Sequence, residues 1–215
     1  MKLARFLPAF VAARLAAGAN PPFPDPVLDE PRASTTTLKK AVLAGGCFWC
    51  TEAVFEHVEG VTQVLSGYSG GTPETADYRI VSTGQTGHAE AIEITYDASR
   101  ITFGQLLRIF FEVAHDPTQR NRQGPDYGPQ YRSAIFYRDE EQKRIAEAYI
   151  RQLDEARVFP RKIATQLEPF RGFYLAEDYH QDFVRRNPNH GYVVVNALPK
   201  IEKLYKACPR LARKK

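Results

Sequence analysis

The chain has 215 residues, of which 43% are hydrophobic and 25% charged, and its formal net charge is +4. This is ordinary globular composition, and the length suits one domain with a sizeable core plus tails. Much of the positive excess lies at the C-terminal end, where a solvated tail is a simpler interpretation than a nucleic-acid-binding one. No stretch approaches the ~20 apolar residues of a membrane span. We therefore expect neither nucleic acid nor a membrane as a partner.

The first 20 residues leave two interpretations open. They carry early positive charge, then apolar residues, then small residues, as signal peptides do. Arg14 interrupts the apolar run, however, so we favour an ordinary extension and a cytoplasmic protein, with export as the alternative. The segment from Asn20 to Pro31 is so rich in proline that no regular element is expected there.

Hydrophobic periodicity and turn residues divide the rest of the chain into alternating strands and helices. Gly45-Gly46 follows a short apolar run and predicts a buried strand that enters a tight turn. Thr102 and Asp139 are placed to cap helices. In chain order we expect strand 39–44, helix 47–58, strands 61–66 and 89–96, helix 102–114, loop 115–130, strand 133–137, helix 139–156, strand 163–167 and helix 175–186, with mostly loop from residue 187 onward. This order predicts an α/β fold, a two-layer sandwich with helices against a mixed sheet.

The three cysteines, Cys47, Cys50 and Cys208, are an odd number. An odd count argues against a secreted disulfide scaffold and for thiol chemistry or a metal site. A zinc site needs four ligands, commonly from two cysteine pairs. Because the chain offers only one such pair, we expect no bound metal.

Cys47 stands where a reactive thiol would be expected. It follows a glycine turn and opens a helix, whose unpaired N–H groups and partial positive charge favour a thiolate. Cys50 lies three residues further on, on nearly the same helical face, so the two thiols can form a disulfide. The alternative is a pair of buried, inert cysteines. The position at the helix start and the preceding Gly-Gly turn argue against that alternative.

Five sequence blocks, in this order, closely resemble the A-type methionine sulfoxide reductases: GCFWCTE, GYSGG, DYRIVSTGQTGHAE, HDPTQRNRQGPDYGPQYRSAI and EDYHQ. The resemblance runs from about Leu38 to near Tyr192. It implies thiol-dependent reduction of methionine S-sulfoxide, free or in proteins, as repair after oxidative damage, on a fold with a ferredoxin-like core. It also implies a monomer with no bound cofactor, reduced by thioredoxin or a similar dithiol protein, or by dithiothreitol in vitro.

The resemblance assigns roles to individual positions of this chain. The catalytic residues fall on Cys47, the acid Glu90 and the oxygen-binding tyrosines Tyr78 and Tyr131; the substrate-binding residues fall on Phe48, Trp49 and Asp126. Many members carry glycine where this chain has Cys50, which leaves open whether Cys50 or Cys208 resolves the intermediate. The expected domains are an N-terminal extension over residues 1–37, a catalytic reductase domain over 38–198 and a basic tail over 199–215 that carries Cys208.

The chemistry needs few groups. Attack of the Cys47 thiolate on the sulfoxide sulfur leaves a sulfenic acid, which condenses with a nearby thiol. Burial would raise the pKa of Glu90 and let it donate a proton to the leaving oxygen; a solvated residue on a strand edge is the alternative. We expect Cys50 to resolve first and Cys208, on a mobile tail, to relay the disulfide outward.

Two other functions share some of these features. A general thiol–disulfide oxidoreductase also carries a CxxC pair, and a non-catalytic module could bind oxidised or methionine-rich peptides. Neither accounts for the five blocks in their order.

Overall fold

The computed structural model describes residues 23–214. The first 20 residues, which carry the extension-or-signal question, lie outside the described residues. Six strands form the main sheet: β1 (Leu38–Gly45), β2 (Val61–Ser69), β3 (Ala89–Asp97), β6 (Ser133–Tyr137), β7 (Gln166–Pro169) and β8 (Phe173–Leu175). A two-stranded ribbon, β4 (Arg122–Gln123) with β5 (Asp126–Tyr127), interrupts the long polar loop.

The helices are α1 (Phe48–Glu56), α2 (Tyr78–Val81), α3 (Phe103–Ile109), α4 (Glu140–Glu155), α5 (Phe183–Arg186) and α6 (Leu198–Ala207). Short 3₁₀ turns cover Pro73–Thr75 and Pro129–Tyr131, and π-helical turns cover Phe110–Ala114 and Val193–Ala197. The caps expected from sequence are confirmed. Thr102 accepts a hydrogen bond from the Gln105 N–H and Asp139 accepts one from the Gln142 N–H.

The sheet order is β7-β6-β1-β3-β2-β8, and every pair is antiparallel except β6 with β7. Its centre is β6-β1-β3-β2, with α1 between β1 and β2 and α3 between β3 and β6. This βαββαβ arrangement is the ferredoxin-like core. The expected α/β class with a mixed sheet is therefore confirmed.

The two outermost strands are close in sequence, although they lie on opposite edges of the sheet. Only residues 170–172 separate β7 from β8. Five strand spacings of ~4.8 Å would put the edges of a flat sheet ~24 Å apart, whereas this link reaches about 14 Å at ~3.6 Å per step. The sheet must therefore curl, and Phe170 and Phe173 pack against the apolar cluster on its concave side.

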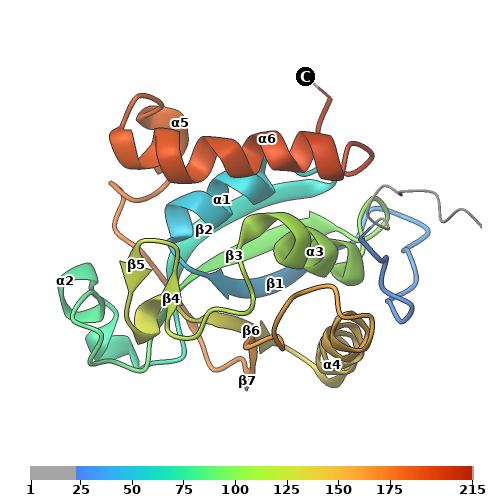
Figure 1. The fold of residues 1–215 in the computed structure, drawn as a ribbon, viewed down its shortest axis with the longest axis horizontal. Coiled ribbons are helices and arrows are strands. Elements are labelled where there is room, and N and C mark those ends of the chain that lie inside the picture. Colours follow the sequence, from blue (N-terminus) through green and yellow to red (C-terminus); the bar gives the residue numbers. More distant parts are fainter. Residues whose placement is uncertain (1–22, 215) are drawn as a thin grey trace, which may run out of the picture.

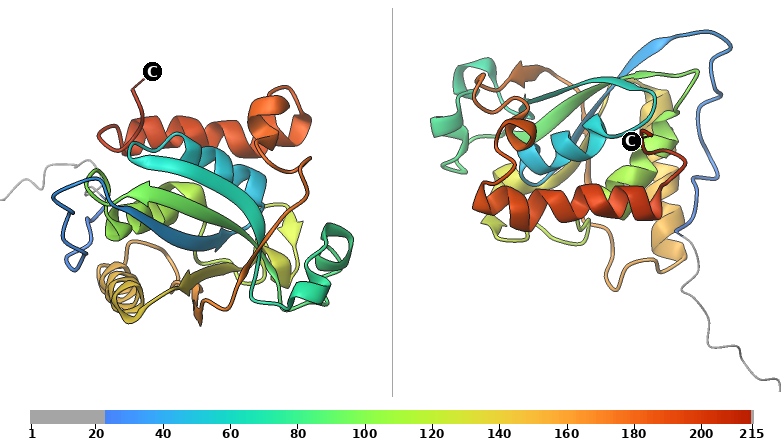
Figure 2. Two further views of the ribbon diagram at one scale, coloured as in Figure 1. Left: turned by 180° about the vertical axis from the view of Figure 1, so that it is seen from behind. Right: turned by 90° about the horizontal axis from the view of Figure 1, so that it is seen from above.

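Helix α1 lies between the sheet and α6, as Figures 1 and 2 show from two directions. Seven of its nine residues are buried, among them Val54 and Phe55 at 0% exposure. A helix covered on both sides carries apolar residues around most of its circumference. Burying a side chain such as Phe55 contributes on the order of 2–3 kcal/mol, so α1 and the cysteines at its start are held firmly.

The C-terminal part of the chain corrects the sequence interpretation. The expectation of mostly loop after residue 187 is wrong, because α6 forms there and the expected boundary at residue 199 falls inside it. Ile201, Leu204, Tyr205 and Cys208 recur at helical spacing, and Leu204 is fully buried. The many lysines between them obscured this apolar stripe. The helix expected over residues 175–186 also shrinks to the single turn of α5.

The proline-rich arm is anchored although it has no regular structure. Residues 23–37 contain no helix or strand. The buried Glu30 carboxylate accepts hydrogen bonds from the Tyr96 hydroxyl and the Phe103 N–H, at 3.0 and 2.9 Å. Among the described residues, no helix is long and apolar enough to cross a membrane.

Candidate active site

Cys47 lies at the junction of β1 and α1. Gly46 makes the turn with a φ of +88°, and a Cβ atom there would come within 2.4 Å of the Gln123 side chain, so only glycine fits. Cys47 occupies the N-cap position of α1, as expected, and the Cys50 N–H bonds back to its carbonyl at 3.1 Å. The two cysteines therefore share the first helical turn, and both are buried and free.

The sequence predicted that the N–H groups at the start of α1 would stabilise a Cys47 thiolate, but the first of them has another partner. The first N–H group of α1, that of Phe48, donates to Glu90 Oε2 at 3.0 Å. Burial raises the pKa of Cys47 well above its ordinary value. A hydrogen bond from Cys47 lowers the pKa of Cys50, and the positive charge of Lys200 adds to this effect. The ionisation of the two thiols is therefore linked, with the proton held on Cys47 stabilising the thiolate of Cys50.

Glu90 is a buried carboxyl in the middle of the sheet. It lies on β3, which pairs with β1 on one side and β2 on the other, and its exposure is 3%. The alternative of a solvated strand-edge residue is therefore wrong. Burial raises the pKa of Glu90 to about 8, although the bond from the Phe48 N–H opposes this. At pH 7 the group is mostly neutral and able to donate a proton.

Two tyrosines on different elements lie within electrostatic reach of Glu90. Tyr78 begins α2, and Tyr131 ends the 3₁₀ turn before β6. Burial raises the pKa of both phenols, and the charge of Glu90 raises it further. Both hydroxyls therefore lie within electrostatic reach of Glu90 and remain protonated hydrogen-bond donors at any physiological pH.

The aromatic residues after Cys47 differ in their surroundings. Phe48 is almost fully buried and packs 4.9 Å from the His180 ring, measured between centroids. Trp49 is only partly buried; it stacks on Phe183 at 3.7 Å and 8°, and its indole N–H donates to His180 Nδ1 at 3.0 Å. Trp49 therefore offers an aromatic face at the surface, whereas much of Phe48 serves packing.

Asp126 has a partner that the sequence interpretation missed. The Tyr192 hydroxyl donates to Asp126 Oδ2 at 2.5 Å, and it lies close enough to Cys47 to oppose the rise in that thiol's pKa. The bond ties the β4–β5 loop to the segment before α6. Tyr192 was named only as the end of the family resemblance, and no local pattern pointed to its role.

Cys208 lies apart from the cysteine pair. It is 3% exposed at the end of α6, its thiol donates to Glu112 Oε2 at 3.3 Å, and burial raises its pKa to about 12. Ala197, just before α6, packs beside Cys50. The ten residues of α6 lie between Ala197 and Cys208, so eleven steps of 1.5 Å place the two roughly 16 Å apart. The expectation of a mobile tail is wrong, because the apolar face of α6 is packed onto the core.

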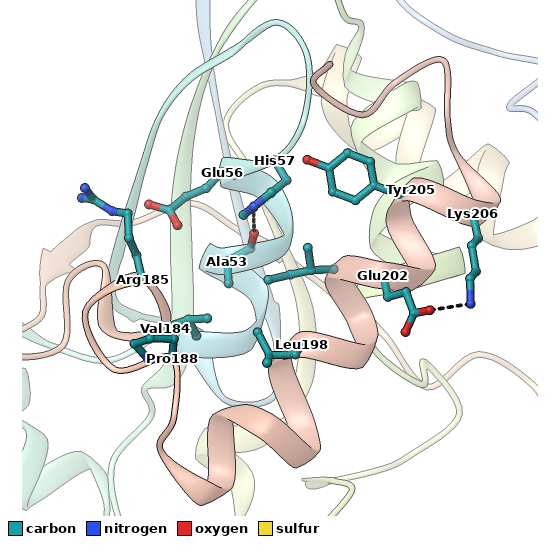
Figure 3. A pocket seen from close by; sticks show the side chains of 11 residues that line it. Ala53, Glu56, His57, Val184, Arg185, Pro188, Leu198, Glu202, Tyr205 and Lys206 are labelled. Carbon is teal, nitrogen blue, oxygen red and sulfur yellow. Dashed lines mark hydrogen bonds and ion pairs between the residues drawn. The ribbon is translucent and has the colours of Figure 1, made fainter. Parts of the chain in front are cut away.

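A groove of about 670 Å³ opens elsewhere, between α1, α5 and α6 (Figure 3). Its walls are mostly apolar, from Ala53, Val184, Leu198 and Ile201, and an ion pair between Glu202 and Lys206 lies at one end. None of the residues predicted for the site lines this groove. In residues 23–214, no group of three or more histidine, cysteine or acidic side chains is arranged to hold a metal.

Two thiols in one helical turn, beside a neutral carboxyl, are the groups that a cysteine-dependent oxidoreductase uses. The model of the family described as "Peptide methionine sulfoxide reductase" matches residues 39–210. The chain belongs to this family, whose chemistry is the reduction of methionine sulfoxide by a thiol, and the resemblance seen in the five sequence blocks is confirmed.

Individual relatives agree with the family assignment. The chain is 59% identical over 182 residues to peptide methionine sulfoxide reductase MsrA 2 of Synechocystis sp., covering 84% of this chain and 85% of the relative. It is 53% identical to MsrA 2 of Mesorhizobium japonicum, covering 81% and 90%. The solved structure of methionine sulfoxide reductase A of Corynebacterium diphtheriae superposes with a TM-score of 0.62 at 34% identity, covering 80% of this chain and 86% of that one.

Proposed function

We propose that this enzyme reduces the S epimer of methionine sulfoxide, free or within proteins, with Cys47 as the nucleophile and Glu90 as the acid. The observation that carries the proposal is the neutral carboxyl of Glu90, which is buried beside the helix start where Cys47 lies. In disulfide exchange the leaving thiolate is stable without a proton, whereas a leaving sulfoxide oxygen requires one.

The residues divide the reaction between them. The substrate methyl group lies against Trp49 and Phe48, and sulfur–aromatic contact is mildly favourable. The oxygen points to the hydroxyls of Tyr78 and Tyr131, which stabilise charge as it develops there. The Cys47 sulfur attacks the substrate sulfur and forms an S–S bond, while Glu90 gives a proton to the oxygen. The S–O and S–S bonds then break as the hydroxyl passes to the Cys47 sulfur, and methionine leaves with the electron pair of the S–S bond. The thiol proton of Cys47 replaces the one that Glu90 gave, so the products are a Cys47 sulfenic acid and methionine.

Cys50 resolves the sulfenic acid in our proposal. It lies in the same helical turn as Cys47, so its sulfur is near enough to attack the sulfenic acid and form the disulfide with loss of water. The relay through Cys208 gains no support from the structure, because that thiol is packed at the far end of α6. Mass-spectrometric mapping after one turnover should find a Cys47–Cys50 disulfide, and a dominant Cys47–Cys208 bond would overturn this order.

The disulfide is then reduced by an external dithiol. Thioredoxin or a similar protein fits this task, because exchange through a mixed disulfide restores both thiols. The proposal also includes a monomer, which light scattering can check. Asp126 contacts the substrate backbone in this scheme, at the entrance formed by the β4–β5 loop.

The cellular compartment is a separate proposal. We place the enzyme in the cytoplasm, because Arg14 interrupts the apolar run that a signal peptide needs. The intact mass of the protein isolated from its native cells should correspond to a chain that retains residues 1–20. A mass that begins after this segment would indicate export instead.

The activity is tested with the separate S and R epimers of methionine sulfoxide and dithiothreitol as reductant. The S epimer should turn over and the R epimer should not, and Cys47→Ser should abolish turnover. Disulfide exchange on insulin that survives in Glu90→Gln, without any sulfoxide turnover by the unmodified enzyme, would favour the general oxidoreductase.

A further inference from the structure

The hydrogen bond between Trp49 and His180 fixes the protonation of the histidine. An indole nitrogen can only donate, so His180 Nδ1, which receives the bond at 3.0 Å, carries no proton. The neutral ring therefore bears its proton on Nε2. That nitrogen is buried and has no partner. The nearest carboxylate oxygen, Glu177 Oε2, is 3.9 Å away and instead accepts the Tyr68 hydroxyl at 2.9 Å.

The turn of residues 177–181 holds a second element of the site. Glu177 Oε1 accepts the backbone N–H of Tyr78 at 2.9 Å, at the start of α2. Gln181 bonds both the N–H and the carbonyl of Ser66 on β2, each at 2.9 Å, and so fixes the turn to the sheet. One turn, tied to the sheet, therefore contacts Trp49 through His180 and Tyr78 through Glu177. The space between these two aromatic residues is the substrate slot of the proposed function.

We infer that the 177–181 turn is a positioning element that sets the width of this slot, with His180 holding Trp49 and Glu177 holding Tyr78. The inference rests on the proposed function, since it assumes that Trp49 receives the substrate methyl group. His180 acts through Trp49 and exchanges no proton with the substrate. Its unprotonated Nδ1 is the property that matters, because a ring protonated there would place two donors face to face.

The stacking partner of Trp49 explains why this bond is needed. Phe183 lies against one indole face at 3.7 Å, and the rings of His190 and Tyr192 make T-shaped contacts with the indole at 6.3 and 5.9 Å between centroids. These rings hold the indole through packing, whereas the bond to His180 is directional. Without an acceptor, the partly buried indole N–H regains a hydrogen bond only by turning toward water, which displaces the ring.

Three variants of His180 separate this role from simple packing. His180→Asn keeps an oxygen acceptor close to the position of Nδ1. His180→Gln displaces the acceptor by one bond, and His180→Leu fills the space without any acceptor. We expect kcat/KM for methionine S-sulfoxide to fall roughly tenfold in the leucine variant, mainly through KM, which corresponds to about 1.4 kcal/mol. The asparagine variant should recover most of this loss.

The only tryptophan of the chain reports on the bond directly. The fluorescence of Trp49 should shift to longer wavelength in His180→Leu and stay near that of the unmodified protein in His180→Asn. Alkylation of Cys47 should proceed at the same rate in all variants. If the leucine variant fails to fold, His180→Gln supplies a second comparison, in which the displaced acceptor should produce a smaller loss in kcat/KM and a smaller shift in fluorescence than loss of the acceptor would.

The outcomes distinguish the two levels of the proposal. An enzyme without S-sulfoxide turnover would refute the proposed function, and the fluorescence series would then still decide the Trp49–His180 bond. An active enzyme whose leucine variant matches it in KM and in fluorescence would refute the positioning role alone. In the Trp49→Phe background, His180→Leu should lower kcat/KM little further, because the indole donor of the hydrogen bond is already missing.

Discussion

Glu90 gives the sharpest test of the mechanism, through the pH dependence of a single turnover. The neutral carboxyl is the active form, and its pKa in the folded protein is raised to about 8. Ionisation of Cys47 raises the rate over the same pH range, so the effect of Glu90 is measured as the rate of the unmodified enzyme divided by that of Glu90→Gln. One titrating group leaves ~90% of Glu90 protonated at pH 7 and ~10% at pH 9, so this ratio should fall about ninefold between them.

The assay uses enzyme in excess over methionine S-sulfoxide, without reductant, and quantifies methionine in quenched samples. This removes the pH dependence of the reducing agent. Glu90→Gln keeps an acceptor for the Phe48 N–H but has no proton to lose. It should be slower by 10²–10⁴-fold at pH 7, and its rate should follow the ionisation of Cys47 alone. A ratio of the two rates that stays constant between pH 7 and 9 would refute the assignment of the acid to Glu90.

Three further predictions address the second thiol, the loop anchor and stability. Cys50→Ser should release one methionine per enzyme and accumulate a Cys47 sulfenic acid that dimedone traps; undiminished disulfide formation would contradict its resolving role. Tyr192→Phe should leave the partly buried carboxylate of Asp126 without its donor and lower the free energy of unfolding by about 1 kcal/mol in urea titrations; an unchanged midpoint would show that the bond contributes nothing. Burial raises the pKa of Glu52 to about 7, so the protonated form stabilises the fold and this contribution is lost as pH rises. The melting temperature should therefore fall less between pH 6 and 9 in Glu52→Gln than in the unmodified protein. Equal slopes of melting temperature against pH in the two proteins would exclude Glu52 as the source of the pH-dependent loss of stability.

Local chemistry explains why much of the fold was predictable. Thr102 and Asp139 each bond an N–H within three residues, so the signal for these helix starts is contained in a short stretch of sequence. The pairing of the outermost strands has no such signal. Strands β7 and β8 can occupy opposite edges despite their short connection because the sheet curls. Curling is a property of the assembled sheet and not of either strand.

The same division applies to the site. The position of Cys47 at a helix start follows from the two preceding glycines, and the burial of Glu90 agrees with an apolar strand pattern. The contact of Trp49 with His180, in contrast, joins residues 131 positions apart. The local sequence around Trp49 or His180 does not predict this contact, so hydrogen bonds of this kind can be identified only from the folded structure.

The position of α1 under α6 has a consequence for how the protein is made. The two motif thiols leave the ribosome early, whereas the helix that covers them is nearly the last part of the chain to appear. At ~5–20 residues per second, about 150 residues of synthesis leave the pair uncovered for on the order of ten seconds. During translation under peroxide stress, the nascent chain is therefore exposed to the oxidant whose damage the finished enzyme repairs.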